Sequence, residues 1–312
     1  MQSETRIWQQ LCALAGISEG GTLSSIISHK TAVDKAHIII RLDPVIGQPL
    51  VYKRVLSKLD EQRFLGLVAG AQLAADLLVN DPRHRAPRVI AHMVEARAML
   101  MEFASGQTLA ARLNASSDVT QEMKRAGAWL SAFHRASAAG PQPFRPQHLI
   151  NAVSRVLSEV RNDLRQIAYR DEFLAAASKL QKSFKSFRGD LTPVAVRHGD
   201  PSVNNLLVSV DAVWGIDMMD PVKMAVAMDI ARLTQSMAET AGLGGMSRYT
   251  RTLQTLLAGY DAPVPEPELI SVLARHRAIM LWARTPDDWR ALSPTEAQRL
   301  ERRIQLATHG IT

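Results

Sequence analysis

The sequence holds little cysteine and no long apolar run, and each absence narrows the class of protein. Cys12 is the single cysteine in 312 residues, so no disulfide can form within the chain. With the chain's size and composition, this favours a cytoplasmic protein. No stretch approaches the roughly 18 uninterrupted apolar residues of a membrane-spanning helix, so we expect no membrane partner. The first 17 residues carry Glu4 and Arg6 among apolar residues, which predicts a short amphipathic helix rather than a signal peptide.

Motifs of nucleic-acid-binding proteins are also missing. Lys and Arg number 37 against 30 Asp and Glu, but the basic residues are scattered, with small clusters in NDPRHRAPR and RLERR. No zinc finger, basic zipper or aromatic-rich RNA motif accompanies them, so we expect a solvated surface and no nucleic-acid partner. The chain shows no repeat or low-complexity segment, and with 46% hydrophobic residues it can bury a core.

The first hundred residues mix strand and helix patterns. Two β-branched runs, AHIIIRL and PLVYKRV, flank the turn residues DPVIGQ and predict a hairpin. Helical spacing follows over residues 57–78, where Ser57 and Asp60 match a capping box and set the expected start of the helix. The run RVIAHMVEARAMLMEFASG predicts two more strands, which end near residue 106.

Beyond residue 106 the pattern is mainly helical, interrupted by a short strand-rich insert at residues 194–221. We therefore predict an α+β fold with two lobes. Residues 1–104 would form a small N-terminal lobe with an antiparallel sheet, and residues 105–312 a larger, mainly helical C-terminal lobe.

The insert carries polar residues at the ends of apolar strands. VAVRHGDPSVNNLLVSVDAVWGIDMMDP contains Asp200, then Asn205 five residues later, and Asp217 directly after a strand-like run. Rigid scaffolds present functional groups at such strand ends. An Asp and Asn at this spacing, followed by a second Asp at a strand end, is what phosphoryl transfer from a magnesium nucleotide requires.

Each polar residue has a role in that chemistry. Mg²⁺ prefers hard oxygen ligands, so Asp217 and the side-chain oxygen of Asn205 are its predicted ligands. Asp200 is the predicted catalytic base, which accepts the proton of an acceptor hydroxyl and orients its oxygen. The alternative is an ordinary turn whose Asp and Asn side chains cap the backbone. We assign His198 a structural role, orienting the loop by hydrogen bonds.

The segment RHGDPSVNNLLV…GIDMMDPVKMAVAMDIARL resembles the motifs of the aminoglycoside phosphotransferase and choline kinase superfamily. That resemblance implies a bilobal protein-kinase-like fold and use of ATP or GTP with Mg²⁺. It also implies that Asp229, in Asp-Ile-Ala, ties the following helix to the catalytic loop. AMLMEFASGQTL resembles the hinge strand of the family, and GAWLSAFHRA resembles its helix ending in Leu-x-x-x-His.

Such an enzyme needs a lysine for the nucleotide phosphates. Strand alternation in LVYKRV places Lys53 on an apolar face, which is costly unless an anion meets it, so Lys53 is the predicted phosphate ligand. Glu61 is its predicted partner on the next helix, with Gln72 and Asp76 as alternatives. Glu61 also suits the helix dipole without any other role.

The remaining nucleotide contacts are predicted from the hinge and the N-terminal loop. The backbone from Glu102 to Ala104 would bind the adenine. In SEGGTLSSII, Gly20, Gly21 and Ser24 would cover the phosphates, although a plain turn explains the same residues.

The predicted function is ATP- or GTP-dependent phosphorylation of a hydroxyl on a small molecule, such as a sugar or metabolite alcohol. The basic charge disfavours a polycationic antibiotic as acceptor. The alternative is a catalytically degenerate pseudokinase that senses nucleotide or binds a protein. Protein phosphorylation is disfavoured because His-Arg-Asp, Asp-Phe-Gly and Ala-Pro-Glu motifs are missing. The sequence makes no prediction of oligomeric state.

Overall fold

The computed structural model describes residues 2–18, 22–31, 36–115, 118–240, 247–285 and 288–311. Its contacts divide the chain into two compact units. Unit 1 comprises residues 1–108, 198–200 and 205–222, and unit 2 comprises residues 109–197, 201–204 and 223–312. The predicted division into residues 1–104 and 105–312 stays a proposal. Unit 1 gathers Asp200, Asn205 and Asp217 with the N-terminal part of the chain.

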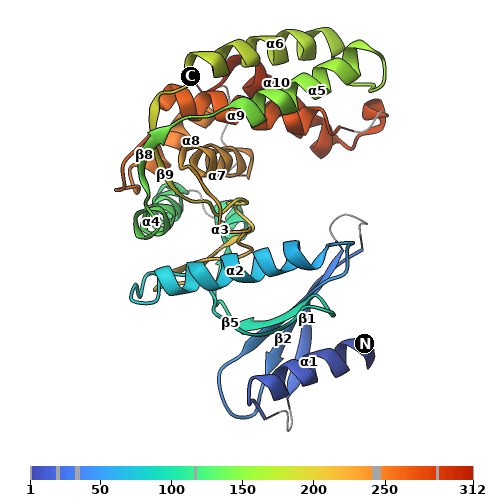
Figure 1. Cartoon of the computed structure of the whole chain (residues 1–312), viewed down its shortest axis with the longest axis vertical. Coiled ribbons are helices and arrows are strands. Elements are labelled where there is room, and N and C mark those ends of the chain that lie inside the picture. The colour runs from blue at the N-terminus through green and yellow to red at the C-terminus, as the bar shows by residue number, and fades with distance from the viewer. Residues whose placement is uncertain are drawn as a thin grey trace. The chain divides into compact units, whose positions relative to one another are not determined.

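Unit 1 is built on an antiparallel sheet in which the described strands follow the order β1-β2-β3-β6-β5. The strands are β1 (Leu23–Lys30), β2 (His37–Asp43), β3 (Leu50–Val55), β5 (Val89–Met93) and β6 (Ala98–Glu102). The predicted hairpin is present, since β2 and β3 pair antiparallel. Figure 1 shows helix α1 (Gln2–Leu14) on one face of this sheet and helix α2 (Glu61–Leu77) on the other.

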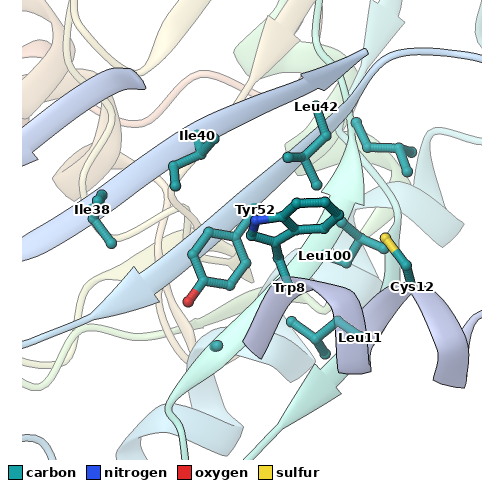
Figure 2. Packing of buried hydrophobic residues seen from close by; sticks show 10 residues of the cluster. Trp8, Leu11, Cys12, Ile38, Ile40, Leu42, Tyr52 and Leu100 are labelled. Atoms are coloured by element: carbon teal, nitrogen blue, oxygen red, sulfur yellow. The ribbon is translucent and has the colours of Figure 1, made fainter. Parts of the chain in front are cut away.

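Alternating side chains give the sheet two apolar faces. Trp8, Leu11 and Cys12 of α1 pack against one face, together with the fully buried Tyr52 of β3 (Figure 2). On the same face, Glu4 accepts hydrogen bonds from the Tyr52 hydroxyl at 2.7 Å and from the Arg54 guanidinium at 2.5 Å. The predicted amphipathic N-terminal helix is therefore present, and it is tied to the strand that carries Lys53.

The opposite face packs under α2. Val55, Met99 and Met101 of the sheet meet Phe64 and Val68 of the helix. The predicted start of this helix needs a correction, because Asp60 rather than Ser57 is the N-cap. The Asp60 carboxylate accepts a hydrogen bond from the Arg63 N–H at 2.7 Å, and this carboxylate satisfies a first-turn amide directly.

A second sheet of unit 1 carries the strand-rich insert. Its strands are β4 (His84–Arg85), β7 (Gln107–Thr108), β10 (Leu206–Val208) and β11 (Val213–Gly215), in the order β4-β11-β10-β7. Sequence patterning predicts β10 and β11, which are short apolar runs. The two-residue strands β4 and β7 have no such pattern, because they form only where a partner strand is already present.

Unit 2 is mainly helical. Its helices are α3 (Leu109–Ala115), α4 (Thr120–Ala136), α5 (Gln147–Arg161), α6 (Arg170–Ser186), α7 (Ala227–Thr240), α8 (Arg248–Leu257), α9 (Pro267–Trp282) and α10 (Pro294–His309), with a short 3₁₀ turn η1 (Trp289–Ala291). A small sheet of β8 (Gly140–Pro143), β9 (Leu191–Val196) and β12 (Lys223–Ala225) accompanies them. Helices α5 and α6 lie side by side in Figure 1. None of the described helices is long and apolar enough to cross a membrane.

Candidate functional site

Two neighbouring strands of unit 1 bring Asn205 and Asp217 together. Asn205 directly precedes β10, and Asp217 follows β11 by one residue. The strands pair antiparallel with Leu206 opposite Gly215. The Ile216 N–H donates to the Asn205 carbonyl at 2.9 Å and extends the ladder by one bond. The two predicted metal ligands, Asn205 and Asp217, therefore lie at the same end of the β10–β11 hairpin.

Asp217 has a backbone conformation that few residues adopt. Its φ is 61°, in the left-handed region, where Asp is tolerated better than β-branched or bulky residues. Such conformations cost free energy and occur most often at functional sites. The change of direction ends the strand at the point where the Asp217 carboxylate meets the Lys53 ammonium, with Nζ to Oδ1 at 2.5 Å.

The charge state of Asp217 follows from these neighbours. Enclosure by protein atoms raises the pKa of its carboxyl, but the charge and hydrogen bond of Lys53 lower it, as do His198 and His37. The net result is a pKa below the ordinary value, so the group is a carboxylate at neutral pH. The side chain is 39% exposed, so solvent screening weakens each of these effects.

The His-Gly-Asp loop is fixed by hydrogen bonds around Asp200. Gly199 has φ 85°, a conformation that favours glycine. The Asp200 N–H donates to His198 Nδ1 at 3.3 Å, and the Asn205 side-chain Nδ2 donates to the Asp200 carbonyl at 2.9 Å. The His198 carbonyl in turn accepts from the Met219 N–H at 3.0 Å. His198 is fully buried, in keeping with the predicted structural role.

Helix α2 approaches the chain beyond Asp217 closely because two of its residues are glycines. A Cβ on Gly70 would lie 1.9 Å from the Met219 carbonyl oxygen, and one on Gly66 would lie 3.1 Å from the Asp220 Cβ. Real Cβ atoms do not approach a carbonyl oxygen to 1.9 Å, so any side chain at position 70 would push the helix and residues 218–220 apart.

The hinge residues Glu102 to Ala104 begin at the last residue of strand β6, which lies between β3 and β5 in the sheet. The Glu102 and Phe103 N–H groups donate to the carbonyls of Arg88 and Pro49, at 2.9 and 3.3 Å. The Glu102 carboxylate accepts from Arg85 at 3.0 Å. Ala104 is buried against Trp214 of β11, and the Arg85 guanidinium lies over the Trp214 ring, 4.1 Å from its centroid.

Two predicted nucleotide-binding residues lie apart from Lys53. Glu61 is exposed at the first residue of α2, and the ion pair formed by Lys53 among the described residues goes to Asp217. Gln72 donates to Asp76 at 2.8 Å, so the two alternatives bond to each other. Ser24 is exposed and pairs with Leu42, whereas Lys53 pairs with Ile39, the partner of Ser28. Gly20 and Gly21 lie outside the described residues.

Counting along β1, Ser24 is four residues from the row of Lys53, about 13 Å away at strand spacing. Ser28 stands in that row, and its hydroxyl lies 3.3 Å from Nε2 of His37. Sequence reasoning missed both Ser28 and His37. Ser28 lies in the row of Lys53 because both pair with Ile39, whereas His37 lies two residues away along β2, in the row of Val55. Both positions follow from the strand register of β1, β2 and β3.

The donor set suits a magnesium nucleotide. Among the described residues, no three or more His, Cys, Asp or Glu side chains group as a metal site. The Asn205 amide is oriented by the bond that its Nδ2 makes, so its oxygen is the end left to accept or coordinate. One amide oxygen and one or two carboxylates are what Mg²⁺ uses when phosphates and water complete its shell. The residues present therefore fit the ion.

Asp229 lies in unit 2, in the first turn of α7, and is nearly fully buried. Its carboxylate lies 3.3 Å from His134 Nε2, and His134 Nδ1 lies 2.8 Å from the Tyr260 hydroxyl. His134 is the histidine of the Leu-x-x-x-His helix. The network joins α7, α4 and the segment after α8.

Comparisons with known proteins agree with this geometry. The model of the phosphotransferase enzyme family matches residues 52–217, the span from the strand of Lys53 to Asp217. No curated protein matches the chain.

Solved structures share the fold at low sequence identity. A choline/ethanolamine kinase family protein from Mesorhizobium loti is 16% identical, with 97% of this chain and 94% of that chain covered and a TM-score of 0.62. An amicoumacin kinase in complex with AMP-PNP, Ca²⁺ and Ami is 13% identical, with 100% and 98% covered and a TM-score of 0.62. A choline kinase from Cryptosporidium parvum is 14% identical, with 97% and 95% covered and a TM-score of 0.58. The predicted α+β, protein-kinase-like fold is therefore confirmed.

Proposed function

Since the chain belongs to the phosphotransferase enzyme family and is a kinase-like phosphotransferase, we propose that it transfers the γ-phosphoryl group of ATP or GTP to a hydroxyl of a small molecule. The observation that carries this proposal is the meeting of Lys53, Asp217, Asn205 and the Asp200 loop in one unit, held by the bonds described above. A turn that only caps backbone groups has no need of a lysine from another sheet.

Asp200 is the proposed base. As the acceptor oxygen bonds to the γ-phosphorus and the bond to the leaving nucleoside diphosphate breaks, the hydroxyl proton passes to the Asp200 carboxylate. The loop bonds from His198 and Asn205 fix the backbone on both sides of this carboxylate. Positioning is the main contribution of such a base when the transition state is loose.

Asp217 and the Asn205 oxygen would hold Mg²⁺, which when bound would neutralise charge on the β- and γ-phosphates. Lys53 would bind the phosphates. The ion pair of Lys53 with Asp217 holds the two side chains together, and phosphate oxygens of a bound nucleotide would compete with Asp217 for Lys53. Ser28, in the row of Lys53, and His37, two residues along β2 from that row, are candidates for further phosphate contacts.

The base of the nucleotide would contact the hinge at Ala104. The Glu102 and Phe103 amides already donate within the protein. The Ala104 amide and the hinge carbonyls are therefore the backbone groups we assign to the adenine or guanine.

The acceptor is a small hydroxyl compound such as a sugar or metabolite alcohol. Among the proteins with this fold are kinases named for choline, ethanolamine and amicoumacin, so the fold serves acceptors of different chemistry. The second candidate function is a nucleotide-sensing or protein-binding pseudokinase. The placement of Glu61 away from Lys53 favours it, because active protein kinases require a Lys–Glu pair.

The test separates binding from turnover. Asp200→Ala should keep Mg²⁺-dependent nucleotide binding and lower kcat by a factor of about 100 or more, since a general base contributes about 10²–10⁴. Asp217→Asn should lose the Mg²⁺-dependent part of nucleotide binding. Asp211→Asn, an exposed carboxylate in the β10–β11 turn, is the matched control and should behave as wild type.

Binding is measured by thermal shift with ATP, GTP and ADP, with and without MgCl₂. Turnover is measured as ADP or GDP release with a panel of sugars, amino alcohols and hydroxylated antibiotics. Wild-type turnover in both the Asp200 and Asp217 variants would refute the assigned roles. Nucleotide binding without release for any acceptor would favour the pseudokinase.

A further inference from the structure

Helices of unit 2 place five arginines around one region, which we call the arginine cluster. Its members are Arg232 on α7, Arg277 on α9, Arg284 in the turn after α9, and Arg299 and Arg303 on α10. The four-residue spacing of Arg299 and Arg303 puts this pair on one face of α10, and Arg284 lies two residues beyond the end of α9. Helix α9 packs against both α7 and α10, so the three helices share one neighbourhood.

These arginines are close enough to repel one another. Burial lowers the pKa of Arg232 to about 9, with added repulsion from Arg277 and Arg284. Burial likewise lowers the pKa of Arg277 to about 10, and Arg303 and Arg284 lower it further against an opposing effect of Glu239. A guanidinium normally titrates above about 12, so the fold holds several cations in partly desolvated positions at a cost in free energy.

Few carboxylates offset this charge. Among the described residues, none of the ion pairs within 4.0 Å includes Arg277, Arg284, Arg299 or Arg303. Within the same part of the chain, the buried Nε atoms of Arg277 and Arg303 have no hydrogen-bond partner.

The two nearby acids are engaged with other groups. The Glu239 carboxylate accepts from Gln235 at 2.8 Å, and Glu296 forms the capping box of α10 with Ser293. Glu239 offsets part of the effect of burial on Arg277, whose pKa is still lowered, and the Ser293 hydrogen bonds together with the charge of Arg299 lower the pKa of Glu296.

A cavity of about 220 Å³ opens beside the cluster. Arg284, Arg299 and Arg303 line it together with Thr285, the apolar Leu292 and Leu300, and one acidic residue, Glu296. This volume is below that of a typical drug-sized pocket, and it matches the anionic group of a metabolite rather than a large ligand.

We propose that the arginine cluster is a binding site for the phosphate or carboxylate group of a small molecule. Guanidinium groups match both oxyanions through paired N–H donors, and they remain charged where a lysine would lose its proton. An anion in the cavity would satisfy donors and remove the repulsion at once. This site is separate from the Lys53 and Asp217 phosphate contacts, which belong to unit 1, and its occupancy does not depend on turnover.

The experiment measures anion binding to the full chain without nucleotide. Inorganic phosphate and glycerol 3-phosphate are titrated by calorimetry and thermal shift at an ionic strength held constant with NaCl, with glycerol as the uncharged control. We expect saturable binding of both anions and none of glycerol. Arg299→Gln/Arg303→Gln should raise the dissociation constant for phosphate at least tenfold. The matched control is Arg155→Gln, an exposed arginine on α5, which should bind as wild type.

The stability of the anion-free variant tests the same idea by another route. If the arginine cluster binds an anion, removing Arg303 relieves repulsion among the remaining arginines. The Arg303→Gln variant without anion should therefore have a Tm equal to or above that of wild type. The increase in Tm that phosphate produces should be smaller in this variant than in wild type. A structural role would give a lower Tm and an unchanged shift, which contradicts the proposal.

Other outcomes also contradict it. The first is an equal phosphate affinity in the Arg299/Arg303 double variant and in the Arg155→Gln control. The second is that wild type shows no saturable binding of phosphate or glycerol 3-phosphate. The third is that the protein binds only RNA or heparin and loses this binding at moderate salt. Binding of glycerol 3-phosphate together with ADP release from ATP would identify the anion as part of the acceptor. Binding without release would identify it as a ligand that is not phosphorylated, and both results support the site.

Discussion

At the scale of single residues, His276 on α9 shows how the fold sets a charge state. Its ring packs edge-on against Phe184, with centroids 5.6 Å apart. Burial, together with the electrostatic effects of His148 and Arg277, lowers the pKa of His276 to about 4. The imidazole is therefore neutral at neutral pH inside the protein.

The pH dependence of stability follows from this shift. Below about pH 6.5 the unfolded chain protonates His276, whereas the folded chain does so only near pH 4. Between these two pH values the unfolded state binds more protons than the folded state. The free energy of unfolding therefore falls as the pH is lowered from about 6.5 to about 4, by at most about 1.4 kcal/mol per pH unit. His276→Gln should show a smaller fall in Tm from pH 7 to pH 4. His309→Gln, an exposed histidine, should follow wild type; equal profiles for all three proteins would exclude this origin.

The sequence alone predicts some residues of the candidate site but not the contacts between them. Asp200, Asn205, Asp217 and Lys53 stay predicted site residues, and strand alternation and strand ends are the local patterns on which that prediction rests. The direct Lys53–Asp217 pair and the row that contains Ser28 depend on contacts between distant segments. No local periodicity encodes those contacts.

At the scale of elements, helix α2 and residues 218–220 form the tightest junction of unit 1. Gly70→Ala adds a methyl group against the Met219 carbonyl oxygen. Overpacking costs about 1–3 kcal/mol, and the better helix propensity of Ala offsets up to about 1 kcal/mol. We expect a lower Tm and weaker Mg²⁺-dependent nucleotide binding, because the displaced segment follows Asp217.

Gly66→Ala is the graded control for this junction, since its added methyl group meets a side-chain carbon at 3.1 Å rather than an oxygen at 1.9 Å. Gly66→Ala should lower the Tm by less than Gly70→Ala does. A Gly70→Ala protein as stable as wild type would show that the helix and the loop can separate freely.

Elements were predicted unevenly for a related reason. The amphipathic helices and the β2–β3 hairpin follow from hydrophobic periodicity. The start of α2 was wrong because Ser57 and Asp60 both satisfy the capping pattern, and only the folded backbone shows that Asp60 bonds to Arg63. Strands of two or three residues such as β4, β7 and β12 are too short for any period to show.

At the scale of the whole molecule, the compact units do not follow the order of the chain. Unit 1 takes residues 198–200 and 205–222 in addition to residues 1–108. β10 pairs with β7, and β11 pairs with β4, so the returning segment shares a sheet with the N-terminal part. The predicted boundary at residue 104 separates Asn205 and Asp217 from residues 1–104, whereas the contacts of the folded chain group them in one unit.

A fragment of residues 1–104 should therefore not bind magnesium nucleotide. It lacks Asn205 and Asp217, and it leaves Ala104 without Trp214. The check is a thermal shift or calorimetric titration with Mg²⁺ and ATP, with the full chain as the positive control. Binding of similar affinity in the fragment would show that the strand-rich insert is not part of the nucleotide site.

The contact between Trp214 and Ala104 has an optical consequence. The indole is buried against the hinge residue and lies under the Arg85 guanidinium, so its surroundings change whenever a molecule touches that backbone. Tryptophan emission is sensitive to nearby charge and polarity. Trp214 is one of five tryptophans, so an emission change that is lost in Trp214→Phe would report on occupancy beside Ala104 without a label.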